Sequence, residues 1–428
     1  MPAGPKSRKV IARDQRVVSP SYGRETSFVF QRGKGVWVWD PDGKKYLDFS
    51  AGIAVMNIGH ANPAVERAIR RQLPLGTHAA FPDFFADLPV RFIETLLELV
   101  PRSLNSAFLA NSGTEAVEAG YKLARWHSSK KWFLAFENCF HGRTMGSLSM
   151  TNSRPVQRER FGPFLPVRHV PFPNPYRSPF RDEEALVEHC IQAILKAIRS
   201  LKGDVAGIFV EPIQGEGGYI VPPQGFFREL RKVCTDHSLL LCDDEVQAGN
   251  FRTGSFLALE GFGVTPDIVS ISKAVGGGLP LGAMLASSRT MDWPPGSHAN
   301  TFGGNLLACA AGIAALNFME KEKLGENARR VGQHILSRLE DMKSRSSIVG
   351  DVRGRGLMIG IEFVKDKRSK TYHPEARARI LHRALEKGLV LLPAGKSVIR
   401  ICPPLIITKE QADLGLDILK QAILAERK

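Results

Sequence analysis

Between residues 106 and 271 the sequence alternates short apolar runs with longer amphipathic segments, and this alternation limits the folds open to the chain. Helical patterns lie between the runs, as at residues 114–126 and 226–237. Five runs have the length and composition of buried strands: residues 107–110, 132–136, 205–210, 239–242 and 267–271. Strands that alternate with helices predict an α/β fold with a mostly parallel sheet.

The segments on either side of residues 106–271 have a different residue pattern. Residues 35–40 and 45–49 are β-prone on either side of a Pro-Asp-Gly turn, which predicts a hairpin, and a helix is expected from Pro63 to Gln72. Residues 1–27 are expected to form a basic, loosely structured arm. After residue 320, helical stretches, three strands (357–363, 389–392 and 398–401) and a closing helix (410–426) suggest a smaller α+β unit. We therefore expect an N-terminal arm and part of a small domain (1–60), a large domain (61–320) and a C-terminal small domain (321–428).

The composition narrows the class of protein. The 428 residues carry a formal net charge of +15, but no zinc-finger or RNA-binding motif accompanies it, so a basic surface suited to anionic ligands is preferred over nucleic-acid binding. The six cysteines form no CxxC pair, and no metal site is expected. Scattered cysteines suit a reducing compartment, so a cytoplasmic location is expected. No segment approaches the ~18 consecutive apolar residues of a membrane span, so no membrane association is expected.

Two motifs at predicted strand ends suit a phosphorylated ring. Ser112, Gly113 and Thr114 open a predicted helix, where free backbone N–H groups and a hydroxyl can hold a phosphate. Phe140 follows the next strand and could stack on a flat ring. Taken alone, the first motif favours an ordinary capped helix, and the second an ordinary packed aromatic.

An acid and an amine follow two further strands. Asp244 lies in an Asp-Asp-Glu run, where a carboxylate could face a ring nitrogen and keep it protonated; the alternative is a solvated acidic strand end. Lys273 stands between a buried strand and a glycine run, where shielding from water would make its amine a better nucleophile. A surface lysine is the ordinary alternative.

Charged residues at other loops suit a substrate with carboxylates. Glu211 and Glu216 belong to a glycine-rich loop after the 205–210 strand. Arg143 could bind a carboxylate with its planar fork, and Arg400, within an apolar strand, needs an anionic partner. Together these residues make up the parts needed to bind pyridoxal 5'-phosphate (PLP) and an amino acid.

From about residue 35 to its end, the chain resembles the class III aminotransferases, the ornithine and 4-aminobutyrate aminotransferase group of PLP fold type I. Six motifs carry the resemblance in order and spacing: SGTEA at 112–116, FHGRT at 140–144, EPIQGEGG at 211–218, DEVQ at 244–247, SKAVGGG at 272–278 and TFGGN at 301–305. The resemblance implies a large domain with a mostly parallel seven-stranded sheet, and a smaller α+β domain built from both ends of the chain.

The resemblance also implies roles for single residues. Lys273 would hold the cofactor covalently and move a proton, and Asp244 would pair with the pyridine nitrogen. Val246 and Phe140 would pack on the two ring faces, with Gln247 near the ring hydroxyl. The remaining cofactor-contacting residues would be Ser112, Gly113, Thr114, His141 and, from the partner subunit of a homodimer with shared sites, Thr301. A higher assembly is left open.

The substrates implied are amino acids and 2-oxo acids. Glu211 and Glu216 would line the pocket, Arg400 would bind a carboxylate or pair with Glu216, and Arg143 would bind a carboxylate at the other end. Ile53 stands where ornithine aminotransferases carry a tyrosine, which favours a 4-aminobutyrate-like donor.

The resemblance is incomplete at one position, where Phe251 replaces a glycine. We expect its ring to reshape the pocket rim. An amino-acid racemase or epimerase on the same scaffold and a non-catalytic nucleic-acid-binding protein are the alternatives to an aminotransferase.

Overall fold

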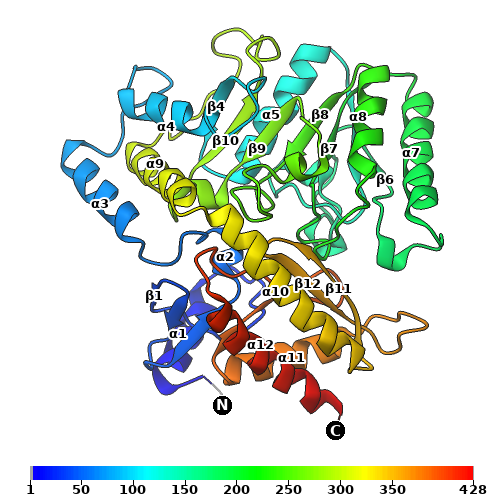
Figure 1. The fold of residues 1–428 in the computed structure, drawn as a ribbon. Helices are drawn as coiled ribbons and strands as arrows, with labels where there is room; N and C mark the ends of the chain where they lie inside the picture. Colours follow the sequence, from blue (N-terminus) through cyan, green and yellow to red (C-terminus); the bar gives the residue numbers. More distant parts are fainter. Residues whose placement is uncertain (1–2, 428) are drawn as a thin grey trace.

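Seven strands of the computed structural model, which describes residues 3–427, form the large sheet expected from the alternating pattern (Figure 1). They run in the order β4-β10-β9-β8-β7-β5-β6. Their bounds are Ser106–Ala110 (β4), Trp132–Phe136 (β5), Val167–Val170 (β6), Val205–Val210 (β7), Leu240–Asp244 (β8), Ile268–Ile271 (β9) and Gly282–Ala286 (β10). Only β10 is antiparallel to its neighbours, β4 and β9, so the mostly parallel sheet is confirmed.

Helices cover the large sheet, which is why a central strand such as β7 is buried along its whole length. Four of the covering helices, α3, α5, α7 and α9, have a polar side chain that accepts from one of their first N–H groups; Asp182, for example, accepts from the N–H of Ala185 at the start of α7. Their bounds are Pro63–Gln72 (α3), Asp87–Leu97 (α4), Gly113–Ser128 (α5), Met145–Met150 (α6), Glu183–Ser200 (α7), Phe226–Asp236 (α8) and Leu306–Lys321 (α9).

Two four-stranded sheets form the lower part of the molecule in Figure 1. One has the order β1-β2-β3-β13 and the other β11-β12-β15-β14. Their strands are Arg32–Lys34 (β1), Trp37–Trp39 (β2), Lys45–Asp48 (β3), Val349–Arg355 (β11), Met358–Phe363 (β12), Leu389–Val390 (β13), Leu392–Ala394 (β14) and Val398–Ile401 (β15). The helices with them are Leu324–Ser344 (α10), Pro374–Glu386 (α11) and Lys409–Leu424 (α12).

Both ends of the chain build this smaller α+β part, as expected. Parallel pairing of β13 with β3 places residue 389 beside residue 47. The residue limits proposed for the three domains remain a prediction. Among residues 3–427, no helix is long and apolar enough to cross a membrane.

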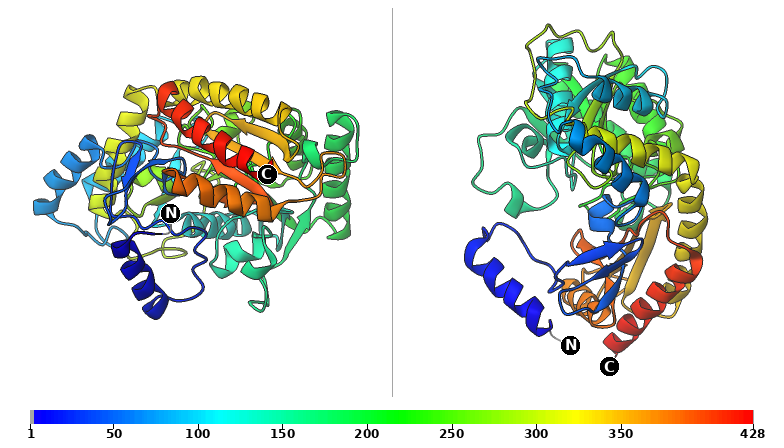
Figure 2. Two further views of the ribbon diagram at one scale, coloured as in Figure 1. Left: turned by 90° about the horizontal axis from the view of Figure 1, so that it is seen from below. Right: turned by 90° about the vertical axis from the view of Figure 1, so that its left-hand side faces the viewer.

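The N-terminal arm differs from expectation because Pro5–Val17 is a helix, α1 (Figure 2). Pro5 occupies the first turn, where a missing N–H costs nothing. The carboxylate of Asp42 accepts from the N–H groups of Lys6 and Ser7, each at 2.9 Å, and so caps the helix from a distant turn. The prediction of a loosely structured arm is therefore wrong, because a tertiary contact supplies the missing cap.

Candidate functional site

The start of α5 offers open backbone donors at the carboxyl end of β4. The Ser112 hydroxyl accepts from the N–H of Glu115 at 3.3 Å, whereas the N–H groups of Gly113 and Thr114 have no recorded acceptor in the described part of the chain. A Cβ on Gly113 would lie 2.7 Å from Cγ1 of Val246. Only glycine therefore fits between these donors and Val246, and the donors have the geometry that suits an anion.

The Phe140–Thr144 motif folds over the same helix start. The Thr114 hydroxyl lies 2.8 Å from that of Thr144 and 2.5 Å from that of Ser147. Gly142 has a φ of +133°, and a Cβ there would lie 2.3 Å from Oγ1 of Thr114. The first two predicted motifs are thus brought together.

A buried acid–histidine pair ends β8. Oδ2 of Asp244 lies 2.7 Å from Nδ1 of His141, and Oδ1 accepts from the N–H of Val246 at 3.1 Å. Nε2 of His141 is buried with no partner among the described residues. Asp243 and Glu245 are buried too; burial raises the pKa of Asp243 well above its ordinary value and that of Glu245 to about 7. The alternative of a solvated acidic strand end is therefore wrong.

Lys273 follows β9 at the first residue of a short 3₁₀ helix, Lys273–Gly276. Its backbone has a φ of +52°, a left-handed conformation that is strained for a residue with a side chain. Burial lowers the pKa of its amine below the ordinary value, while the nearby carboxylates of Asp244 and Glu216 oppose that shift. The surface-lysine alternative does not hold, and the amine lies within the electrostatic reach of the predicted acids.

Two carboxylates of the loop after β7 have different partners. Glu211 accepts from the N–H groups of Phe140 and Gly215, each at 2.9 Å, and burial raises its pKa to about 7. Glu216 instead accepts from Nη1 of Arg400 at 2.7 Å. Burial opposes ionisation of Glu216, but the Arg400 guanidinium outweighs it and holds the pKa of that carboxyl below its ordinary value.

Sequence reasoning missed Tyr219, whose hydroxyl donates to Oε1 of Gln247 at 2.9 Å. Tyr219 is fully buried, and its backbone is left-handed with a φ of +54°. It lies at the end of the glycine-rich loop that carries Glu211 and Glu216. An aromatic residue directly after two glycines is the signal that could have drawn attention to it.

Three predicted residues lie outside this group of contacts. Arg143 is exposed, with its guanidinium carbon 5.9 Å from the centroid of the Phe140 ring. Thr301 is exposed on the loop before α9. Ile53 is 38% exposed and belongs to α2 (Ala51–Ala54), a turn whose residues all have positive φ. No recorded contact joins any of the three to Lys273.

The ring of Phe251 has two packing neighbours. Its ring stacks edge-on against Phe256, with 5.3 Å between centroids, and a Cβ on Gly325 of α10 would lie 3.0 Å from it. The ring packs against the core, and its effect on the pocket rim remains a prediction. A φ of +64° at Phe251 shows that the turn keeps the backbone conformation that suits glycine.

Known proteins match this chain along nearly its whole length. The family model described as aminotransferase class-III matches residues 18–423. An acetylornithine aminotransferase of Methanosarcina mazei is 41% identical, over 96% of this chain and 96% of that protein. An alanine/serine racemase of Pyrococcus horikoshii is 36% identical, over 99% of this chain and 91% of that protein. A PLP-bound amine transaminase structure from an uncultivated Pseudomonas species superimposes with a TM-score of 0.90 at 33% identity, covering 96% of this chain and 98% of that one.

The fold and the cluster around Lys273 are those of a PLP-dependent enzyme. More narrowly, the chain belongs to the class III aminotransferase family, so the resemblance drawn from its motifs is confirmed. Its own residues fit the cofactor: open N–H donors at α5 suit the phosphate, a buried carboxylate suits the ring nitrogen, and a shielded amine suits the aldehyde. Among the described residues, no group of side chains could hold a metal ion.

Proposed function

We propose that this enzyme moves an amino group from an ω-amino acid, of the 4-aminobutyrate or ornithine kind, or from a related amino acid, to 2-oxoglutarate or a similar 2-oxo acid. The observation that carries the proposal is the grouping of one shielded amine with the Glu216–Arg400 ion pair and Asp244. The likeness to an acetylornithine aminotransferase supports a donor with a second functional group.

Cofactor binding is assigned to the residues at the strand ends. The N–H groups of Gly113 and Thr114, with the neighbouring hydroxyls and Thr301 of the partner subunit, would hold the phosphate. Asp244 would hold a proton on the ring nitrogen, and His141 would fix the orientation of that carboxylate through the 2.7 Å contact. When bound, PLP supplies an aldehyde and a ring that accepts electrons.

The ring environment is assigned to three further side chains. Val246 and Phe140 would contact the two ring faces. Gln247 would face the ring hydroxyl, and Tyr219 holds its amide in place. These contacts would restrict the ring to one plane, so that the bond broken at the substrate carbon stays aligned with it.

Proton transfer is assigned to Lys273. Because burial lowers the pKa of its amine, a larger fraction is neutral near pH 7, and a neutral amine can take a proton from the substrate carbon. The carboxylates of Asp244 and Glu216 then stabilise the ammonium that results. The same two carboxylates limit how far the pKa falls.

Substrate binding is assigned to two arginines and their surroundings. Arg400 is buried and paired with Glu216, and would exchange that partner for a substrate carboxylate. Arg143 is free of any recorded ion pair among the described residues and would bind a second carboxylate. Glu211 and Ile53 complete the pocket lining in this proposal.

The proposal includes a homodimer with shared sites. Large apolar side chains are exposed close to the loops that would contribute Thr301: Leu75, Phe84, Phe85 and Phe302. Phe85 is fully exposed, and Phe302 is 60% exposed beside Thr301. Apolar side chains grouped in this way are typical of a subunit interface.

The test uses the purified protein loaded with PLP. The visible absorption band of the loaded enzyme should vanish in Lys273→Ala and persist in Lys122→Ala, a matched control. Borohydride treatment should leave the cofactor attached to Lys273 alone. A donor-by-acceptor screen of the two half-reactions then identifies the substrates; label on another lysine, or no conversion of any donor, would overturn the proposal.

A racemase is the second candidate, favoured by the 36% identity to an alanine/serine racemase over 99% of this chain. Racemisation needs a second acid–base group opposite Lys273. Incubation with single L-amino acids and no oxo acid separates the two activities. Accumulation of the D-isomer would identify a racemase, whereas conversion of the bound cofactor to its amine form would identify a transaminase.

A further inference from the structure

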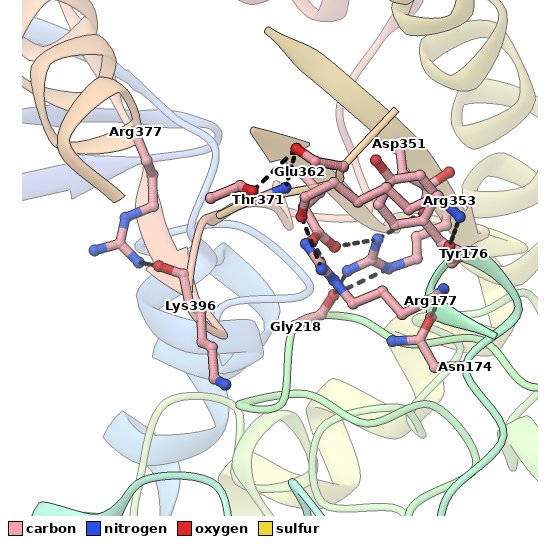
Figure 3. A network of polar contacts seen from close by, with 12 residues as sticks. Asn174, Tyr176, Arg177, Gly218, Asp351, Arg353, Glu362, Thr371, Arg377 and Lys396 are labelled. Atoms are coloured by element: carbon pink, nitrogen blue, oxygen red, sulfur yellow. Dashed lines mark hydrogen bonds and ion pairs between the residues drawn. The ribbon is translucent and has the colours of Figure 1, made fainter. Parts of the chain in front are cut away.

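Apart from the group of residues around Lys273, a cavity of about 550 Å³ lies between the large sheet and the smaller α+β part. The loops after β5 and α6 form one wall, and β11, β12, β15 and α11 form the other. Figure 3 shows a network of polar contacts that includes several of its lining residues. Five cationic side chains line the cavity, against two carboxylates, Glu159 and Glu362: Arg154, Arg177, Arg353, Arg377 and Lys396. We call it the arginine pocket.

Two of the arginines are neutralised by the wall itself. Glu362, which is 2% exposed, pairs with Arg177 and lies 2.8 Å from Arg353. Asp351 pairs with Arg353 at 2.7 Å. Arg353 also donates to the carbonyl oxygen of Gly218 at 2.6 Å. This network attaches the wall to the glycine-rich loop. Its two carboxylates balance the charges of Arg177 and Arg353, so neither arginine has an unpaired charge to offer a ligand.

Arg377 and Lys396 stand apart from that network (Figure 3). Arg377 donates only to main-chain carbonyls, that of Lys396 at 3.1 Å and that of Gly395 at 3.5 Å, and its Nε is buried without a partner. Among residues 3–427, no carboxylate lies within ion-pair distance of Arg377 or Lys396, and Arg154 reaches only Glu25, at 3.5 Å. An arginine held partly buried without an acid is unfavourable unless a ligand supplies the charge.

The pocket adjoins the proposed substrate site. Gly217 lines it, and the preceding residue, Glu216, pairs with Arg400. The N–H of Gly395, another lining residue, donates to the carbonyl oxygen of Glu216 at 2.8 Å. The positive charge of Arg154 also helps to lower the pKa of Glu216, so Arg154 is near enough to act on both sites.

We propose that the arginine pocket is a second anion site, in which Arg154, Arg377 and Lys396 bind a carboxylate-bearing ligand outside the group around Lys273. The carboxylate could belong to the far end of a long amino-acid substrate or to a free dicarboxylic acid. The site itself does not depend on amino transfer, whereas its use for a substrate rests on the proposed function.

The first test measures binding of glutarate, an unreactive dicarboxylate, to the PLP-loaded enzyme by calorimetry. Wild type should show two classes of site. Arg377→Gln/Lys396→Gln should weaken one class at least tenfold and keep the other, and Arg400→Gln should do the reverse. Lys365→Gln/Lys387→Gln, which also removes two positive charges but at exposed positions outside the pocket, is the charge-matched control. Glutarate binding in the double variant equal to that of wild type would overturn the proposal.

The second test distinguishes the two sources. The KM is compared for donors with and without a distal carboxylate, 2-aminoadipate and alanine. If the KM of the double variant rises about tenfold for 2-aminoadipate alone, with kcat unchanged, the site binds the substrate. If the double variant loses one class of glutarate site while both KM values stay unchanged, the site binds a free acid. If the double variant fails to fold, Lys396→Gln alone, an exposed change, replaces it. An enzyme inactive with every donor would defeat the proposed function but leave the calorimetric result intact.

Discussion

The hydroxyl of Tyr219 donates a hydrogen bond to Oε1 of Gln247 at 2.9 Å, and both residues are buried. This contact leaves the amide nitrogen of Gln247 as the group that can point toward the cofactor ring. In the proposed cofactor site, Tyr219 would therefore be a positioning residue for the cofactor hydroxyl, acting through Gln247.

Tyr219→Phe should loosen that amide and shift the pH at which the visible band of the PLP-loaded enzyme titrates. Loss of one buried hydrogen bond is expected to lower kcat by about three- to tenfold. Tyr176→Phe is the control, because the Tyr176 hydroxyl has no hydrogen-bond partner among the described residues. An unchanged titration in Tyr219→Phe would mean that the hydroxyl serves packing alone.

Removal of the Glu216 charge should make Arg400 more available to substrates. In Glu216→Gln the competing carboxylate is gone, so we expect the KM for 2-oxoglutarate to fall about fivefold, which corresponds to about 1 kcal/mol. Steady-state kinetics with a fixed donor measures this, and the exposed Glu410→Gln is the control. A KM that rises instead would show that Glu216 supports acceptor binding.

Stability should depend on pH through His169. Burial lowers the pKa of this histidine to about 4, and its Nε2 lies 2.7 Å from the carbonyl oxygen of Met150. The unfolded chain binds a proton near pH 6.5, so the folded state loses stability as the pH falls from about 6.5 toward 4, by about 2 kcal/mol after allowance for partial exposure. Urea unfolding at pH 7 and pH 4.5 should show a smaller difference in His169→Gln than in wild type or in the exposed His237→Gln.

Arg252 should be among the most costly side chains to remove. It is fully buried and donates to the carbonyl oxygens of Leu357 at 3.1 Å and Pro403 at 2.5 Å, and to the side chain of Asn57. Arg252→Met leaves these buried acceptors unsatisfied and should lower the free energy of unfolding by about 3 kcal/mol. Urea unfolding measures the loss, and Arg199→Met, on the exposed face of α7, should change it by less than about 0.5 kcal/mol. A loss of that small size in Arg252→Met would contradict the argument.

The central strands could be predicted from the sequence because they are buried on both faces, which makes them short apolar runs. Gly282–Ala286 escaped notice because its alanine, methionine and leucine favour a helix; it is a strand because β4 and β9 both hydrogen-bond to it. Val167–Val170, whose middle residues are arginine and histidine, lies at the sheet edge and carries no apolar run. Tertiary pairing decided both strands.

The parts of the site that lie directly at strand ends were predictable, since parallel strands bring their carboxyl ends to one edge. Asp244 and Lys273 follow from that rule. Contacts between residues far apart in the sequence do not follow from it: Asp42 caps a helix 35 residues away, and Arg377 of α11 lines the same cavity as Arg154. Cytoplasmic location, suggested by the cysteines, remains a prediction; all six are buried and unpaired in the structure.

Glu362 joins two arginines that come from different layers of the molecule, Arg177 from a loop beside the large sheet and Arg353 from β11. If the two layers separated at this point, a deeply buried carboxylate would lose one of its two cations, which is costly. The two ion pairs of Glu362 therefore hold the two layers together, so movement of one layer relative to the other should be most restricted at this point.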